Sequence, residues 1–194
     1  MTTTATTRKV RATLALYTMP IVAVLLSATV WPAKADQGQD NRAPEVPTTT
    51  LQVGDGYKVS FQAYAVGVQI YVATPSPADP TQFVWTFRAP EAVLFDNDGG
   101  VVGIHYAGPT WETESGSKVV AARVSGATVD ATAIPWLLLS AVSTAGPGIL
   151  DQTEYIQRVN TTGGLAPAAA PTQAGQEARV PYTADYYFFR EAQH

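Results

Sequence analysis

The chain has 194 residues, of which 46% are hydrophobic and only 14% are charged, and its formal net charge at pH 7 is −4. This length favours one domain, and low charge with 15 glycines and 14 prolines argues against a coiled coil or a charged helical bundle. The acidic balance argues against nucleic-acid binding, and the absence of cysteine excludes disulfides, zinc–thiolate sites and iron–sulfur clusters.

The N-terminal segment has the layout of a secretory signal. Basic residues lie within 8–11, an apolar stretch covers 12–30, and Ala33 and Ala35 supply the small residues that a signal peptidase reads. We therefore expect residues 1–35 to be a cleaved signal peptide and the protein to be secreted, or periplasmic and part of the cell envelope. The alternative is a single membrane anchor, although polar residues dilute the apolar stretch.

Cleavage would make the chain more acidic. The first 35 residues contain four of the 12 basic residues and none of the 16 acidic ones, so the remaining chain would carry a net charge of −8. Such a charge favours solubility and disfavours anionic partners. We expect no nucleic acid and, after cleavage, no membrane as a partner, while the oligomeric state stays open.

The remaining chain shows the two-residue periodicity of β-strands. Residues 36–50 are polar and contain two prolines, which predicts an extended lead-in to a single β domain over 51–194. Alternating apolar, β-branched and aromatic residues then predict a series of short strands. The predicted strands cover residues 57–64, 67–73, 83–88, 92–95, 101–106, 118–125, 136–143, 153–159 and 182–190.

The connections between these strands carry turn signals. Residues 75–80 are rich in proline, 96–100 contain an Asp-Gly pair typical of a hairpin, and 166–176 form an Ala- and Pro-rich surface loop. The apolar run near 135–140 is compatible with a buried strand or with a short helix. The fold prediction is all-β: a single antiparallel β-sandwich or flattened β-barrel of about eight to ten strands, with few or no helices outside the signal peptide.

Four phrases are more specific than this pattern. They are GIHYAGPTWE at 103–112, IPWLLL at 134–139, YIQRVNTTGG at 155–164 and VPYTADYYF at 180–188. In this order they resemble DUF3455, a family of secreted bacterial and fungal proteins of uncharacterised function, over roughly residues 53–190. The resemblance implies an exported single domain and brings no assigned catalytic residues.

The chain departs from that family at two positions. The family resemblance implies, for many members, one cysteine just after the tyrosine of the second strand and another in the loop before the last strand. Here these places correspond to Ala73 and approximately to residues 168–170. The lost cross-link would have to be offset by packing.

His105 is the candidate catalytic residue, because the only other histidine is the last residue of the chain. A turn at Gly108 could bring His105 and Glu112 into one cleft, where the pair could move a proton. The acid could also come from Glu114 or Asp185. The alternative is structural: His105 would bond a backbone carbonyl and fix this corner. Enclosure of the imidazole would leave only binding or structure as its role.

Aromatic side chains near acids indicate a binding cleft. Tyr106, Trp111, Asp185 and Tyr187 are candidate ligand-binding residues, because flat rings stack on sugars or peptides while polar groups orient them. The alternative is that these rings fill the core. We expect a non-catalytic exported protein that binds a small molecule, glycan or peptide. A secreted hydrolase or lyase using His105 is the second hypothesis, and a structural envelope protein is the third.

No cofactor and no metal are expected. The acidic turn at 96–100 has the start of a calcium loop but lacks its bidentate glutamate, so a hairpin turn explains it better. The Gly-Pro-Gly of residues 146–148 lacks the third glycine and the helix of a nicotinamide site. No Gly-x-Ser-x-Gly sequence is present to form a nucleophile elbow.

Overall fold

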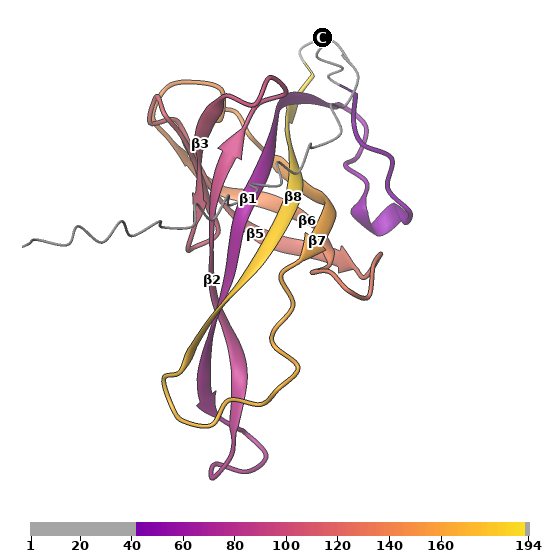
Figure 1. Cartoon of the computed structure of the whole chain (residues 1–194). Coiled ribbons are helices and arrows are strands. Elements are labelled where there is room, and N and C mark those ends of the chain that lie inside the picture. Colours follow the sequence, from indigo (N-terminus) through magenta and orange to yellow (C-terminus); the bar gives the residue numbers. More distant parts are fainter. Residues whose placement is uncertain (1–41, 193–194) are drawn as a thin grey trace, which may run out of the picture. The chain divides into compact units, whose positions relative to one another are not determined.

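A computed structural model describes residues 42–192, in which eight antiparallel strands close into one barrel (Figure 1). The expected signal peptide (1–35) and the first part of the lead-in lie outside the described residues. The strands are β1 (Tyr57–Pro75), β2 (Phe83–Phe95), β3 (Val101–Tyr106), β4 (Thr110–Thr113), β5 (Lys118–Ala127), β6 (Trp136–Ala145), β7 (Tyr155–Gly163) and β8 (Glu177–Glu191). A short 3-10 helix, η1 (Thr49–Leu51), precedes them.

The all-β prediction is confirmed, with differences in where strands begin and end. The predicted strands 57–64 and 67–73 are one continuous strand, β1, because Gly67 does not interrupt pairing. A Cβ at this position would lie 2.1 Å from the carbonyl oxygen of Glu91, so glycine permits the close approach of β2. The predicted strands 83–88 and 92–95 likewise join into β2. Strand β4 was not predicted, and the 135–140 segment belongs to β6, not to a helix.

Each strand pairs with its neighbours in sequence, and β8 closes the barrel by pairing with β1. The wall therefore consists of consecutive hairpins, as alternating polar and apolar residues with short turns predict. Side chains that point inward form the core, and one end of the barrel is packed with large apolar residues. These include Phe61, Leu94, Val119, Leu150, Ile156 and Phe188.

Three strands continue beyond the rest of the barrel as an arm, formed by residues 68–75, 83–91 and 177–181. In this part β2 and β8 pair only with β1, because β3 pairs with β2 from Ala92 onward and β7 pairs with β8 from Tyr182 onward. Figure 1 shows the arm as a twisted extension below the barrel. The arm thus extends the wall on one side of one barrel end.

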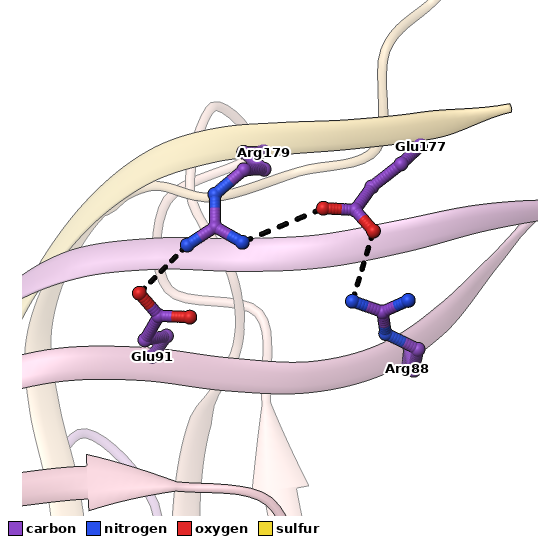
Figure 2. Close-up of polar contacts among 4 residues, drawn as sticks. All are labelled: Arg88, Glu91, Glu177 and Arg179. Atoms are coloured by element: carbon purple, nitrogen blue, oxygen red, sulfur yellow. Dashed lines mark hydrogen bonds and ion pairs between the residues drawn. The ribbon is translucent and has the colours of Figure 1, made fainter.

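A chain of ion pairs crosses the outer face of the arm (Figure 2). Arg179 lies 2.7 Å from Glu91 and 3.4 Å from Glu177, and Glu177 lies 2.9 Å from Arg88. The residues come from β2 and β8, so the ion pairs bridge two strands across β1. Ile70 of β1 pairs in register with Arg179 and is only 4% exposed. The ion pairs therefore lie over an apolar residue on the outside of the wall.

The 164–176 loop, of which residues 166–176 were predicted as a surface loop, is hydrogen-bonded to the arm. The Tyr71 hydroxyl donates to Gly164 O (2.7 Å), and the Trp85 indole N–H donates to Ala169 O (2.9 Å). The amides of Ala73 and Gly175 close two backbone bonds between the loop and β1. Ala73 pairs with Trp85 across β1 and β2. These bonds hold the region where the family resemblance implies a disulfide in many members.

Within residues 42–192, no helix has the length and apolar character needed to cross a lipid bilayer.

Candidate ligand-binding cavity

The β3–β4 hairpin sorts the predicted site residues onto two faces. In its register His105 lies opposite Trp111, Ile104 opposite Glu112, and Tyr106 opposite Thr110. His105 and Trp111 are 2% and 1% exposed and point into the barrel. Tyr106 and Glu112 are half-buried on the outer face. The structure therefore brings His105 together with Trp111 and separates it from Glu112, since neighbouring positions of a strand face opposite ways.

His105 is enclosed and fixed by the backbone. Its Nδ1 lies 2.8 Å from Thr110 O, and because a carbonyl oxygen only accepts, Nδ1 carries the proton. The neutral ring then has an unprotonated Nε2. The imidazole stacks on Trp111 and meets Tyr186 edge-on, with ring centroids 4.2 and 5.1 Å away. The pKa of His105 is lowered to about 3, chiefly by burial. The hydrogen bond to Thr110 O acts in the opposite direction, and the positive charge of Arg158 lowers the pKa further.

Outside the barrel, Tyr106 and Glu112 form a pair of their own. The Tyr106 hydroxyl donates to Glu112 Oε2 at 2.6 Å, and Lys118 Nζ lies 3.9 Å from the same oxygen. The hydrogen bond to the carboxylate raises the pKa of Tyr106. This carboxylate therefore faces solvent and the β5 lysine, and not the interior imidazole.

The other two predicted residues, Asp185 and Tyr187, also lie on the outer face, on β8. Asn160 donates to Asp185 Oδ2 at 2.7 Å, and Gln62 donates to the Tyr187 hydroxyl at 2.9 Å. Burial raises the pKa of Tyr187 to about 12, and the negative charge of Asp185 contributes to this increase. Tyr186, between them, points inward and is 1% exposed. The predicted cleft is thus divided by the sheet into an interior and an exterior part.

The interior part belongs to a cavity of about 520 Å³ at the barrel end that carries the arm. The cavity wall is largely aromatic and aliphatic, and this volume is within the usual range of roughly 300–1,000 Å³ for small-molecule sites. An eight-stranded barrel is just wide enough to be filled by side chains or to hold one small ligand. The main apolar residues of the wall are Tyr71, Phe87, Trp111, Ile134, Leu137 and Leu139.

Several buried polar atoms of this wall lack hydrogen-bond partners within the described residues. They are Gln69 Nε2, Trp111 Nε1 and the Tyr186 hydroxyl, on residues no more than 2% exposed. The hydroxyls of Tyr182 and Tyr186 lie near each other, with Gln69 close to the first and Arg158 close to the second, yet neither hydroxyl has a partner at hydrogen-bonding geometry. Unpaired buried polar groups are costly, with about 1–3 kcal/mol lost for each. Each such group in a folded protein needs an explanation, and a bound molecule that supplies the missing partner is one.

The rim of the cavity is held in place by hydrogen bonds. Arg158 donates from Nε (3.2 Å) and Nη2 (2.8 Å) to Pro135 O. Thr161 donates to Ile134 O at 2.6 Å, and the Ile134 amide donates to Gly163 O at 2.9 Å. Loop 128–135 is therefore fixed to β7, so that this side of the opening has a defined shape before any ligand enters.

Sequence reasoning missed the cavity residues that come from distant strands. Gln69, Tyr71 and Arg158 were not singled out, although alternation places the first two on one face of β1. Arg158 lies within one of the four family-like phrases, which was the available signal. Its proximity to His105 depends on closure of the barrel, and no local pattern reports that.

The acidic turn of residues 96–100 is a hairpin turn, as predicted. Asp96 Oδ1 accepts from the amides of Asp98 (3.0 Å) and Gly100 (2.7 Å), which uses the carboxylate to close the β2–β3 connection. Across residues 42–192 no group of three His, Asp or Glu side chains is arranged to hold a metal ion.

Comparisons with known proteins place the chain in a family without adding an activity. No curated protein and no solved structure is significantly similar to it. A family model described as "Protein of unknown function (DUF3455)" matches residues 54–190, which include all of β1 to β7 and all of β8 except its last residue. The chain belongs to the DUF3455 family of proteins of unknown function.

Proposed function

We propose that this chain is an exported, non-catalytic binding protein that holds one small molecule in the barrel cavity. The observation that carries the proposal is the 520 Å³ cavity, whose wall joins stacked aromatic rings to buried polar atoms without partners. Apolar walls supply binding free energy, and a few fixed polar groups supply orientation. The N-terminal sequence pattern supports export.

The environment of His105 supports binding over acid–base catalysis. A general base works best when its pKa is near the operating pH, whereas burial lowers the pKa of His105 to about 3. Its Nδ1 proton is engaged by Thr110 O, and no carboxylate lines the cavity. In this proposal His105 is a neutral wall residue that offers an acceptor nitrogen and a flat ring.

A fluorescent probe tests the proposal. N-phenyl-1-naphthylamine is uncharged at neutral pH and gains fluorescence in apolar surroundings. We expect it to bind purified protein lacking residues 1–35 with one-to-one stoichiometry. Leu137→Trp adds a large ring to the cavity wall and should abolish the signal. Val142→Trp adds the same ring to the same strand, at a side chain 67% exposed, and should leave binding intact.

Both variants must be folded for this comparison, which near-UV circular dichroism and thermal unfolding establish. Leu139→Phe is a smaller cavity-filling change that serves if Leu137→Trp fails to fold. A probe that binds equally to wild type and to the filled variants sits elsewhere, and the proposal would then be wrong. Absence of any binding to wild type would also overturn it.

A further inference from the structure

The cavity has a charge that differs from that of the whole chain. Its wall includes Arg88, Arg123 and Arg158 but no aspartate or glutamate, although acidic residues outnumber Lys and Arg by 16 to 12 in the sequence. Cations placed around an apolar cavity with no anion between them create a positive potential there, because the low-dielectric wall focuses the field.

Two of these three arginines have no carboxylate partner. Arg88 is paired with Glu177, as Figure 2 shows, so its charge is largely balanced. Arg158 donates to Pro135 O and lies close to the Tyr186 hydroxyl, and neither of these partners is a carboxylate. Arg123 makes no hydrogen bond or ion pair with any described residue. Guanidinium groups without a carboxylate partner at a cavity wall are suited to an incoming oxyanion.

The sheet geometry directs Arg123 toward the opening. Arg123 pairs in register with Leu139 of β6, which lines the cavity, so the two side chains lie on the same face of the wall; the register shifts only after Arg123. Next to it, Gly126 leaves room for the guanidinium: a Cβ there would lie 2.8 Å from Arg123 Nη2. Arg123 on β5 and Arg158 on β7 flank Leu137 and Leu139 of β6.

The field of Arg158 already acts on the cavity wall. Its positive charge opposes protonation of His105. Burial raises the pKa values of Tyr71 and Tyr186, and the charge of Arg158 offsets part of this increase. In addition, the unpaired atoms of Gln69 and Trp111 are N–H donors. Beside the acceptor nitrogen of His105, these polar groups of the wall are donors or carry positive charge, so their complement is a group that accepts hydrogen bonds.

We propose that the ligand is a small amphipathic carboxylate, with an aromatic or alkyl body against Trp111 and Leu139 and its carboxylate at Arg158 and Arg123. This inference rests on the proposed function and specifies the class of ligand. A monoanionic carboxylate fits better than a phosphate monoester, because Arg158 already uses two donors on Pro135 O and removing a dianion from water costs more.

The test compares two probes of equal shape, naphthalene-2-carboxylate and naphthalene-2-carboxamide, in displacement of N-phenyl-1-naphthylamine. The carboxylate should bind about ten- to a hundredfold more tightly, as expected for charge-assisted hydrogen bonds. This preference should fall in Arg123→Gln and disappear in the double variant Arg123→Gln/Arg158→Gln. Arg190→Gln removes a half-buried arginine outside the cavity wall and should keep the preference. Naphthyl phosphate should bind less tightly than the carboxylate.

Arg158 also holds the rim, so Arg158→Lys serves as the variant that keeps the charge without the bidentate contact. It should retain a reduced preference for the carboxylate. Equal affinity of wild type for both naphthalene probes, with the neutral dye still bound, would overturn this inference and leave the proposed function standing. A preference that survives in the double variant, or a stronger binding of the phosphate, would also overturn it. Failure of the dye itself to bind would overturn the proposed function.

Discussion

His105 and Trp111 lie directly opposite each other in the β3–β4 hairpin, and their rings stack with planes 14° apart. The imidazole is thereby fixed between an indole on one side and the Thr110 carbonyl at its edge. The same pair faces the cavity, so this ring contact both stabilises the β3–β4 hairpin and forms part of the cavity wall. A substitution of either residue should therefore affect both the stability of the barrel and the shape of the cavity.

The low pKa of His105 predicts a stability loss in mild acid. The folded-state pKa of about 3 lies below the usual value of 6.5, so between these values the unfolded chain binds a proton that the folded chain does not. Stability is therefore fully present above pH 6.5 and falls toward pH 3, at a limiting slope of about 1.4 kcal/mol per pH unit. Urea unfolding between pH 7.5 and 4.5 should show this slope, and His105→Gln should flatten it. An unchanged slope would mean that the imidazole is accessible to protons in the folded protein.

Gln69 and Gln157 offer a matched comparison of paired and unpaired buried amides. Each is 2% exposed. Gln157 Nε2 donates to Leu51 O at 2.6 Å, although Gln157 Oε1 has no partner, whereas Gln69 Nε2 has none within the described residues. Gln157→Met should cost about 1–3 kcal/mol in the free energy of unfolding, while Gln69→Met should be neutral or stabilising. Chemical denaturation measures both. Equal losses would indicate that Gln69 is satisfied by water in solution.

Tyr71→Phe should loosen the 164–176 loop. The substitution removes the buried hydroxyl that donates to Gly164 O and leaves that carbonyl without its partner, at a cost of about 1–3 kcal/mol. Faster amide exchange should appear in residues 164–176 before it appears in the rest of the barrel. Tyr106→Phe deletes a hydroxyl bound to Glu112 on the outer face and should change stability by less than about 1 kcal/mol. Similar effects of the two variants would contradict a loop held by Tyr71.

The ion pairs across the arm should couple weakly and respond to salt. A double-mutant cycle between Glu91→Gln and Arg179→Gln should give a coupling of about 0.2–1 kcal/mol, because both side chains are substantially exposed. This coupling should shrink in 1 M NaCl. Arg179→Gln should cost more than Glu91→Gln, since its stem lies over Ile70 and two carboxylates lose their partner. A coupling unaffected by salt would contradict this account.

Local pattern predicted the strands well and the site only in part. Alternation around 57–64 and 101–106 reports which residues share a face, so the class of fold followed from it. The link between β1 and β8 joins residues more than a hundred positions apart and has no local signature. His105 and Trp111 were identified because they lie in one hairpin. Arg123 and Arg158 reach the cavity through pairing with β6 and through barrel closure, so their role required the three-dimensional structure.

Closure between the first and last strands brings the start of β1 beside the end of β8: Tyr57 pairs with Glu191, and the Ala192 amide donates to Gly56 O at 2.8 Å. A few inserted residues could therefore join these two points. New termini could then be opened at the exposed Asp98-Gly99 turn, giving a circular permutant in which every strand keeps its neighbours. In such a permutant the strands would be synthesised in a different order, while their order around the barrel wall would stay the same.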